Sequence, residues 1–248
     1  MFSTIALDQD ASDSLRKYCD IWINPTQIRL TDESIIEQPS APIQGITSGP
    51  DGTFFGAYSY SWTPIGQHVK SVGRYCSIGG WVIFGDHEHP TDWLTTSNIP
   101  WDHNFITGAF AKRSNPDLPI RPYKSTLGAI SIGHDVWVGS RSYIKRGVSI
   151  GNGAIIGANA VVTKDVPPFG IVTGNPGRVR RFRFDEETIQ LIQECAWWQY
   201  DFADIGTLDF ADPVAACKAI IRRAESGDLI PYAANQMNAA GLKDALAT

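Results

Sequence analysis

The stretch from Ile132 to Pro167 repeats with a period of six residues. Written in sixes it reads IGHDVW, VGSRSY, IKRGVS, IGNGAI, IGANAV and VTKDVP. The first position of every hexad is aliphatic: Ile132, Val138, Ile144, Ile150, Ile156 and Val162. Because Val, Ile and Leu make up about a fifth of ordinary sequence, six aliphatics in one column have a chance probability of order ~10⁻⁴. The period matches neither an α-helix nor a simple strand.

Two further features accompany this column. Four of the six aliphatics are followed directly by Gly, and the fifth position of each hexad is small enough to fit beside a larger neighbour in a narrow core. The fifth column contains Val136, Ser142, Val148, Ala154, Ala160 and Val166. An earlier block, VGRYCS, IGGWVI and FGDHEH, starts at Val72 and has the same pattern, with Cys76 in the small column.

Three hexads are the length of one triangular coil of a β-solenoid. In such a coil the aliphatic column faces inward, and Gly allows the backbone to turn at the corners. The two ends of a stack of coils are open sheet edges, and these must be covered to prevent aggregation. The sequence therefore predicts a mainly β protein whose N-terminal segment and C-terminal helices serve as caps.

The regular sixes stop at about Asp86 and resume near Leu127. The intervening residues, 86–126, are rich in Trp, Pro, Asn and His. Long insertions of this kind inside a compact domain are uncommon and are usually functional. We therefore expect an N-terminal extension over 1–53, coils with an excursion loop over 54–183, and a helical segment with a tail over 184–248.

Helix signals occur outside the coils. A short helix is expected around residues 13–20. Asp185 is placed to cap a helix with Glu186 and Glu187 in its first turn, and Asp212 followed by Pro213 is placed to open another. The last fifteen or so residues read as a loose tail.

Composition excludes several classes of protein. The chain has 248 residues, a hydrophobic content of 43%, a net charge of -5 and a pI near 5.5. This charge balance argues against general binding to nucleic acid or to an acidic membrane. The sequence begins without the features of a signal peptide, has no apolar run of membrane-spanning length, and contains four widely spaced cysteines. We expect reduced thiols and a cytoplasmic protein.

Three stretches together resemble the hexapeptide-repeat acyltransferases. They are the hexads, the run GDHEHPTDWLTT from Gly85 to Thr96, and VVTKDVPPFGIVTGNPGRV from Val161 to Val179. The likeness is to the xenobiotic acetyltransferase subgroup, of streptogramin and chloramphenicol type, and to related sugar O-acetyltransferases. It implies a left-handed parallel β-helix with a long excursion loop and C-terminal α-helices, a homotrimer, and an active site between adjacent subunits. The hand comes from the resemblance alone, since the general crossover rule favours a right-handed path.

The resemblance also implies the reaction. It indicates direct transfer of an acetyl group from acetyl-CoA to a hydroxyl of a sugar, a polysaccharide precursor or an antibiotic. Such a transfer needs a general base, and His is the side chain best suited to this task near neutral pH. The candidates are His89 and His87. We favour His89 because its spacing to Trp93 and Thr95 matches the family pattern. A carboxylate is expected to orient the base, with Asp86, Glu88 and Asp92 as the candidates.

Coenzyme A would be held by a locally basic region. Residues 141–183 contain eight Arg or Lys and one acid, Asp165, in a chain that is acidic overall. Cations beside a groove would bind the coenzyme's phosphates. Lys164 and Arg178 are the favoured pair, because the segments VVTK and GNPGR match segments that line the family's coenzyme groove. The other matching positions are Trp137, Gly139, Gly157, Ala158 and Thr163.

Two other functions fit parts of the sequence. A zinc enzyme like the γ-class carbonic anhydrases would need His87, His89 and His103 as ligands, but the hexads lack a ligand pair of their own, and we expect no metal. A non-catalytic binding or assembly module would not need the His loop or the basic region. Cys76 belongs to the inward column and is expected to pack in the core rather than act as a nucleophile. The acceptor is not encoded in any of these patterns.

Overall fold

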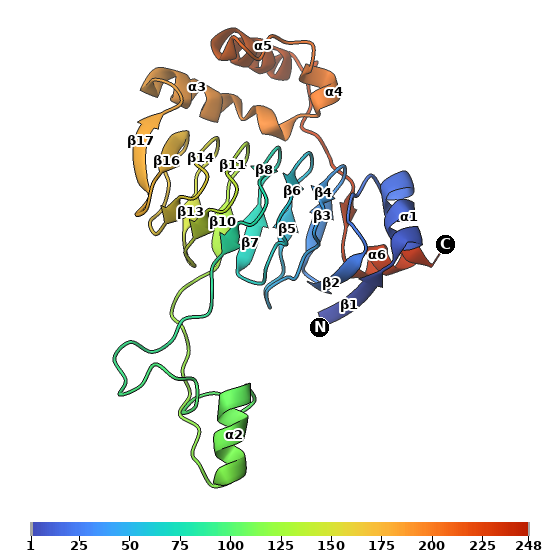
Figure 1. The fold of residues 1–248 in the computed structure, drawn as a ribbon. Helices are drawn as coiled ribbons and strands as arrows, with labels where there is room; N and C mark the ends of the chain where they lie inside the picture. The colour runs from blue at the N-terminus through green and yellow to red at the C-terminus, as the bar shows by residue number, and fades with distance from the viewer. Residues whose placement is uncertain (1, 248) are drawn as a thin grey trace. The chain divides into compact units, whose positions relative to one another are not determined.

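The computed structural model describes residues 2–247 and contains two compact units (Figure 1). One unit is the excursion, Asp86–Gly128, and the chain on either side of it forms the other. The larger unit is a parallel β-helix with helices packed on it. None of the helices within the described residues is long and apolar enough to cross a bilayer.

The parallel strands of residues 2–247 lie on three faces. The first face contains β3 (Ile35–Glu37), β5 (Phe54–Phe55), β7 (Val69–Val72), β10 (Ile130–Ile132) and β13 (Ser149–Ile150). The second contains β4 (Ala41–Pro42), β6 (Tyr60–Ser61), β8 (Ser77–Ile78), β11 (Trp137–Val138), β14 (Ile155–Ile156) and β16 (Gly170–Thr173). The third contains β9 (Ile83–Phe84), β12 (Tyr143–Ile144) and β15 (Val161–Val162). At the far end β17 (Arg178–Phe182) pairs antiparallel with β16 and covers that edge.

Both hexad columns face the interior, as the period predicted. Every member of the aliphatic and small columns is buried. The strands stack in register, so that Ile132 pairs with Ile150 and Val138 with Ile156. Ser142, the polar member of the small column, donates a hydrogen bond from Oγ to the Gly139 carbonyl at 2.9 Å. This bond offsets the cost of burying its hydroxyl.

Most glycines that directly follow the aliphatic column do not make the turns, contrary to our expectation; Gly85 is an exception. Left-handed conformations at the corners are found two places after those glycines, at Tyr75, Asp135 and Arg141, and at Gly153 of the hexad IGNGAI. The glycines are needed because adjacent coils come too close for a side chain. A Cβ on Gly73 would lie 2.4 Å from the Gly133 carbonyl oxygen, and one on Gly139 would lie 2.5 Å from the Ala158 nitrogen.

The N-terminal segment extends into the coils. The parallel strands start at Ile35, ahead of residue 54, where we expected the coils to begin. Before them, β1 (Phe2–Leu7) pairs antiparallel with β2 (Thr26–Thr31). Helix α1 (Gln9–Cys19) begins four residues before the predicted start, since the Asp8 side chain accepts a hydrogen bond from the Ala11 amide. We overlooked Asp8 as a capping residue.

The two C-terminal helices begin where their capping residues predicted. α3 (Glu186–Cys195) is capped by Asp185 and α5 (Pro213–Glu225) by Asp212. Together with the short α4 (Phe202–Ile205) they form what we call the helical layer, which lies along one corner of the coils rather than over an end (Figure 1). In the segment that joins α3 to α4, the ring of Trp198 stacks on His134 of the coils at 5.4 Å between centroids. Burial and the nearby Arg74 lower the pKa of His134 to about 4, which keeps the stacked ring neutral.

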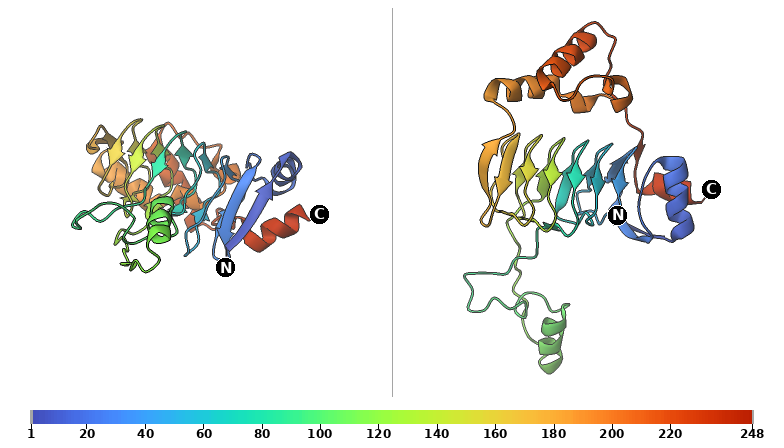
Figure 2. Two further views of the ribbon diagram at one scale, coloured as in Figure 1. Left: turned by 60° about the horizontal axis from the view of Figure 1, so that its bottom comes forward. Right: turned by 45° about the horizontal axis from the view of Figure 1, so that its top comes forward.

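The expectation of a loose tail was wrong. The chain returns from the helical layer to the first coil, where β18 (Gln236–Met237) pairs antiparallel with β3 (Figure 2). It ends in α6 (Ala239–Leu246), which packs against α1. Ala239 and Leu242 are buried in the same core as the coils. The first coil is therefore covered by both ends of the chain.

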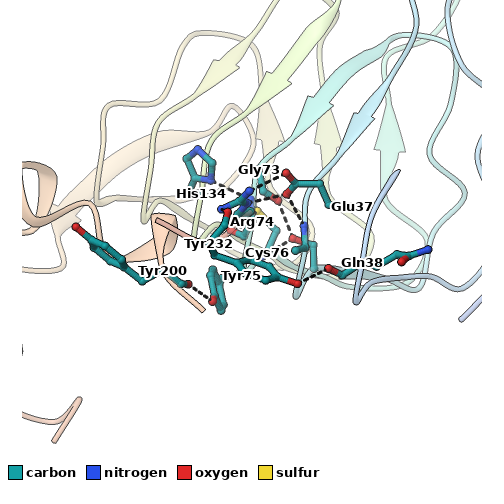
Figure 3. Close-up of polar contacts among 11 residues, drawn as sticks. Glu37, Gln38, Gly73, Arg74, Tyr75, Cys76, His134, Tyr200 and Tyr232 are labelled. Atoms are coloured by element: carbon teal, nitrogen blue, oxygen red, sulfur yellow. Dashed lines mark hydrogen bonds and ion pairs between the residues drawn. The ribbon is translucent and has the colours of Figure 1, made fainter. Parts of the chain in front are cut away.

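A buried ion pair connects this returning segment to the coils (Figure 3). Arg74 donates from Nε and Nη2 to the two carboxylate oxygens of Glu37, both at 2.7 Å, and Glu37 also accepts from the Ala57 amide. The Arg74 guanidinium lies 5.5 Å from the ring centroid of Tyr232, whose hydroxyl donates to the Gln38 carbonyl. Burial raises the pKa of Glu37, but the bonds from Arg74 and Ala57 outweigh it and hold the pKa below its usual range.

The close approach of the coils can be tested with Gly73→Ala. The added methyl group would meet the Gly133 carbonyl, so we expect a loss of about 1–3 kcal/mol in the free energy of unfolding, measured by urea denaturation. Gly66→Ala is the matched control, since a Cβ there has no atom within 4 Å, and it should change stability by less than about 1 kcal/mol. Equal effects of the two substitutions would contradict the role assigned to Gly73.

The buried pair predicts a pH-dependent defect. Arg74→Met leaves the Glu37 carboxylate buried without its cation and should cost about 3 kcal/mol or more at pH 7. The pKa of Glu37 is lower in the folded protein than in the unfolded chain. The ion pair therefore stabilises the fold fully at a pH above the ordinary pKa of glutamate, and this stabilisation is lost as the pH falls through the pKa of folded Glu37. The difference between wild type and Arg74→Met should therefore narrow in acid. The double variant with Glu37→Gln should recover most of the loss; an unchanged defect in both tests would contradict this account.

Candidate functional site

The His89 ring is oriented by a backbone carbonyl. Its Nδ1 lies 2.6 Å from the carbonyl oxygen of Thr96. A carbonyl can only accept a hydrogen bond, so Nδ1 carries the proton and donates it. The neutral ring then has its lone pair on Nε2. His89 is exposed, which leaves Nε2 accessible as a proton acceptor.

An aromatic cluster surrounds this ring within the excursion. Trp101 lies edge-on to His89 at 5.8 Å between centroids. Trp101 also contacts Tyr123 at 5.6 Å, and Tyr123 contacts Trp93 at 6.0 Å. These rings support the chain between the start and the end of the excursion. Trp93 served as a spacing landmark in the sequence, whereas Tyr123 had no signal beyond its aromatic character near the point where the hexads resume.

None of the three candidate carboxylates makes the Nδ1 contact of His89. Asp86 accepts instead from the His87 backbone amide at 2.7 Å. The Thr96 carbonyl takes the role expected of Asp86, Glu88 or Asp92. Every residue has a main-chain carbonyl, so the residue types alone could not predict that the Thr96 carbonyl would be the partner of His89. His87 is also exposed and lies two residues before His89 in the same loop.

The structure brings together part of the predicted coenzyme set. Gly139, Gly157 and Ala158 follow strands of the second face, and Gly139 directly contacts Ala158 at the corner to the third face. Gly177, which precedes Arg178, donates its amide hydrogen bond to the Val161 carbonyl at the start of β15. Gly139, Gly157 and Ala158 therefore line one corner, and the chain next to Arg178 returns to it through Gly177.

The other members of the set lie on or beyond the strands that flank that corner. Trp137 is on the outer side of β11 and is 55% exposed, so its indole is presented to the surroundings of the second face. Thr163 and Lys164 follow β15 at its opposite end and are exposed. A ligand that contacts the whole set would have to extend along the coils.

The basic residues of 141–183 differ in how exposed they are and therefore in whether they could bind a ligand's phosphates. Arg183 donates to Asp135 at 2.8 Å and to the Gly153 carbonyl, so it is a structural residue that joins β17 to a coil corner. Burial raises the pKa of Asp135, although Arg183 opposes this effect. Lys145 and Arg146 are half-buried. The remaining cations are exposed: Arg141, Lys164, Arg178, Arg180 and Arg181.

Cys76 packs in the core, as its column predicted. It is completely buried, and its thiol donates to the Gly133 carbonyl at 3.1 Å. Burial raises the pKa of this thiol to about 12. The group is thus held protonated and away from solvent, the opposite of a reactive cysteine.

A zinc enzyme would need His87, His89 and His103 as ligands. Within residues 2–247 no group of three His, Cys, Asp or Glu side chains is arranged to hold a metal ion. His89 turns its Nδ1 toward Thr96, and His103 is buried.

Comparison with known sequences agrees with this architecture. A family profile described as "Hexapeptide repeat of succinyl-transferase" matches residues 129–164. A chloramphenicol acetyltransferase from Agrobacterium fabrum is 39% identical over 51% of this chain and 58% of its own length, and one from Escherichia coli is 39% identical over 54% and 61%. The chain thus spans about three fifths of these relatives.

A fuller match is found elsewhere. A probable macrolide acetyltransferase from Lysinibacillus sphaericus is 32% identical over 64% of this chain and 86% of its own length. Among solved structures, a serine acetyltransferase from Neisseria gonorrhoeae aligns over 55% of this chain and 41% of its own, with 19% identity and a TM-score of 0.36, a likeness too low to add to the assignment. The hexads, the stacked parallel coils and the match to most of the macrolide acetyltransferase's length together place this chain in the hexapeptide-repeat acyltransferase family, beside its chloramphenicol and macrolide acetyltransferases.

Proposed function

We propose that this chain is an acetyl-CoA-dependent O-acetyltransferase with His89 as its general base. Membership of the family supports the class of reaction, since the relatives include chloramphenicol and macrolide acetyltransferases. The observation that carries the chemistry is the bond from His89 Nδ1 to the Thr96 carbonyl. It fixes the tautomer whose Nε2 accepts a proton.

In the proposed reaction, the acceptor hydroxyl gives its proton to Nε2 of His89 while its oxygen attacks the thioester carbonyl of the donor. The ring becomes an imidazolium, and the Thr96 carbonyl then accepts a stronger, charge-assisted hydrogen bond from Nδ1. As the carbon–sulfur bond breaks, Nε2 returns its proton to the departing sulfur. The acetyl group ends on the acceptor oxygen, coenzyme A leaves as the thiol, and His89 is restored.

Direct transfer is the simplest version of this reaction for this chain. A covalent acetyl-cysteine route would need a thiolate near the surface. Cys76 is fully buried, and its pKa is raised to about 12. Its position therefore supports a mechanism in which donor and acceptor are bound together.

The donor would lie along the coils. Lys164 and Arg178 are exposed cations that would bind its phosphates, while Gly139, Gly157 and Ala158 leave room for the pantetheine arm. Trp137 and Thr163 would complete the contact. We propose left-handed coils and a homotrimer in the cytoplasm, as the family resemblance implies, with a sugar, saccharide precursor or antibiotic as the acceptor.

The identity of the base is tested by matched histidine substitutions. His89→Ala should lower turnover by about 10²-fold or more and leave coenzyme binding unchanged, because the general base is removed but the coils are not. His87→Ala is the control and should retain turnover. Activity is measured as thiol release from acetyl-CoA with a panel of sugars, oligosaccharides and antibiotics, and binding as the thermal shift with coenzyme A.

These experiments distinguish a wrong choice of histidine from a wrong proposed function. Loss of turnover in His87→Ala with retention in His89→Ala would show that the wrong histidine was chosen. Absence of both thiol release and thermal stabilisation at millimolar coenzyme A in the wild type would contradict the proposed function and favour a binding or assembly module.

The coenzyme surface is tested by removing its cations. Lys164→Ala and Arg178→Ala should each raise the KM for acetyl-CoA by about tenfold, because each removes a charge-assisted contact to phosphate. The effect should weaken at high salt. Arg222→Ala, at an exposed position on α5, is the control. A KM unchanged in both coil variants would show that the phosphates bind elsewhere.

A further inference from the structure

Two cavities adjoin at Trp22, in the segment that connects α1 to β2. One has a volume of about 260 Å³ and the other about 290 Å³, and Trp22 lines both. The Trp22 side chain is 49% exposed. Trp62 also lines the first cavity, and Tyr58 and Tyr60 line the second. We call the two cavities together the Trp22 groove.

The main chain at Trp22 is fixed to the first coil. The Trp22 amide donates to the Ser40 carbonyl, and the Ser40 amide donates to the Asp20 carbonyl, both at 3.0 Å. The Asn24 amide donates to the Ile43 carbonyl at 2.8 Å. The groove is therefore part of the folded frame, as a binding site that is formed before its ligand arrives must be.

Each cavity has in its wall a buried serine whose hydroxyl lacks a partner. Ser12 lines the first cavity and Ser40 the second, and these residues are 5% and 6% exposed. Within residues 2–247 neither Oγ has a hydrogen-bond partner. An unpaired buried hydroxyl destabilises a protein, and rotation about the Cα–Cβ bond gives each hydroxyl three staggered positions. A polar ligand in the groove would supply the missing partners.

The charges in the walls favour a neutral ligand. Asp13 and Arg16 both line the first cavity, and Asp20 lines the second. An anion that filled both cavities would meet Asp20, and a cation would meet Arg16. A ligand without charge avoids both repulsions.

The groove also offers a flat aromatic surface beside polar side chains. The Arg16 guanidinium lies 3.7 Å from the Trp22 ring centroid and covers one face of the indole. The indole remains half exposed, so its other face is available for stacking. The amide side chains of Gln9 and Asn24 line the same cavity as Trp62. A pyranose ring has the complementary structure, with C–H groups on its face and hydroxyls around its rim.

We propose that the Trp22 groove binds a neutral oligosaccharide, with one sugar ring in each cavity. Drug-sized ligands occupy cavities of about 300–1,000 Å³, so each of these cavities suits a single ring, and a ligand that fills both has at least two. Sugar hydroxyls pair with Ser12 and Ser40, and ring C–H groups stack on Trp22. The groove contains none of the residues proposed for acetyl transfer or coenzyme binding, so this inference does not rest on the proposed function.

The test screens the full-length protein against immobilised neutral di- to tetrasaccharides of glucose, galactose, mannose and N-acetylglucosamine, and titrates the strongest ligand by isothermal calorimetry. We expect at least one to bind at millimolar concentration or below, and its monosaccharide to bind about tenfold more weakly or worse, because it fills one cavity. Trp22→Ala should weaken binding by about tenfold or more. Trp81→Ala is the matched control, since Trp81 is 80% exposed and lines neither cavity.

The two serines separate a binding role from a structural one. Ser12→Ala and Ser40→Ala should each weaken oligosaccharide binding by about three- to tenfold, because the ligand loses a hydrogen bond. Neither substitution should lower the Tm of the free protein, since the hydroxyl that it removes has no partner there within residues 2–247.

The proposal is overturned if no neutral oligosaccharide binds at millimolar concentration, or if Trp22→Ala binds as well as the Trp81→Ala control. It is also overturned if the wild type binds no saccharide and Trp22→Ala lowers the molar mass in light scattering, since a second copy of the chain would then cover the groove. None of these measurements uses thiol release, so failure here would leave the proposed function standing.

Discussion

The spacing between successive coils is the constraint on which the rest of this structure depends. Parallel strands on each face lie about 4.8 Å apart, so the backbone of one coil meets the next at every corner. Gly73, Gly133 and Gly139 occupy such contacts, where a Cβ would come within about 2.5 Å of the adjoining coil. Regular stacking also aligns side chains into columns. The narrow interior then accepts only aliphatic and small residues, with Ser142 tolerated because its hydroxyl is paired.

The inward columns of the coils are occupied by packing residues. Residues that could bind a ligand are therefore found at the corners of the coils and in the excursion that interrupts the repeat. At the corner lined by Gly139 and Ala158 no large side chain projects from these two positions, because both residues are small. Exposed cations lie nearby in the sequence. The excursion that interrupts the repeat contains His89, the proposed general base. His89 is held by a contact inside the excursion itself, the Thr96 carbonyl, so its tautomer does not depend on a charged partner.

The helical layer and the returning C-terminal segment are held to the coils by interactions that differ from the apolar packing inside the coils. Stacked aromatic rings and hydrogen bonds attach the helical layer, as at Trp198 and His134. The returning C-terminal segment is joined to the first coil through Tyr232, beside the Glu37–Arg74 pair. The contacts of Tyr232 join positions more than a hundred residues apart. Together with β18 and α6 they bring the C-terminal segment to the coil that the N-terminal segment also covers.

The sequence by itself determined the coils, the inward columns, the extent of the excursion and the capped starts of α3 and α5, because each follows from a local pattern that the residues carry. It also pointed to His89 through the spacing of neighbouring residues. Only the tertiary structure decided that Gly73, Gly133 and Gly139 allow close contact between coils rather than turning, and that Thr96 orients His89. It also decided that Arg183 pairs with Asp135 and that the tail joins the core. Each of these depends on backbone groups or on residues distant in the chain, and their proximity is created by folding rather than by any repeat.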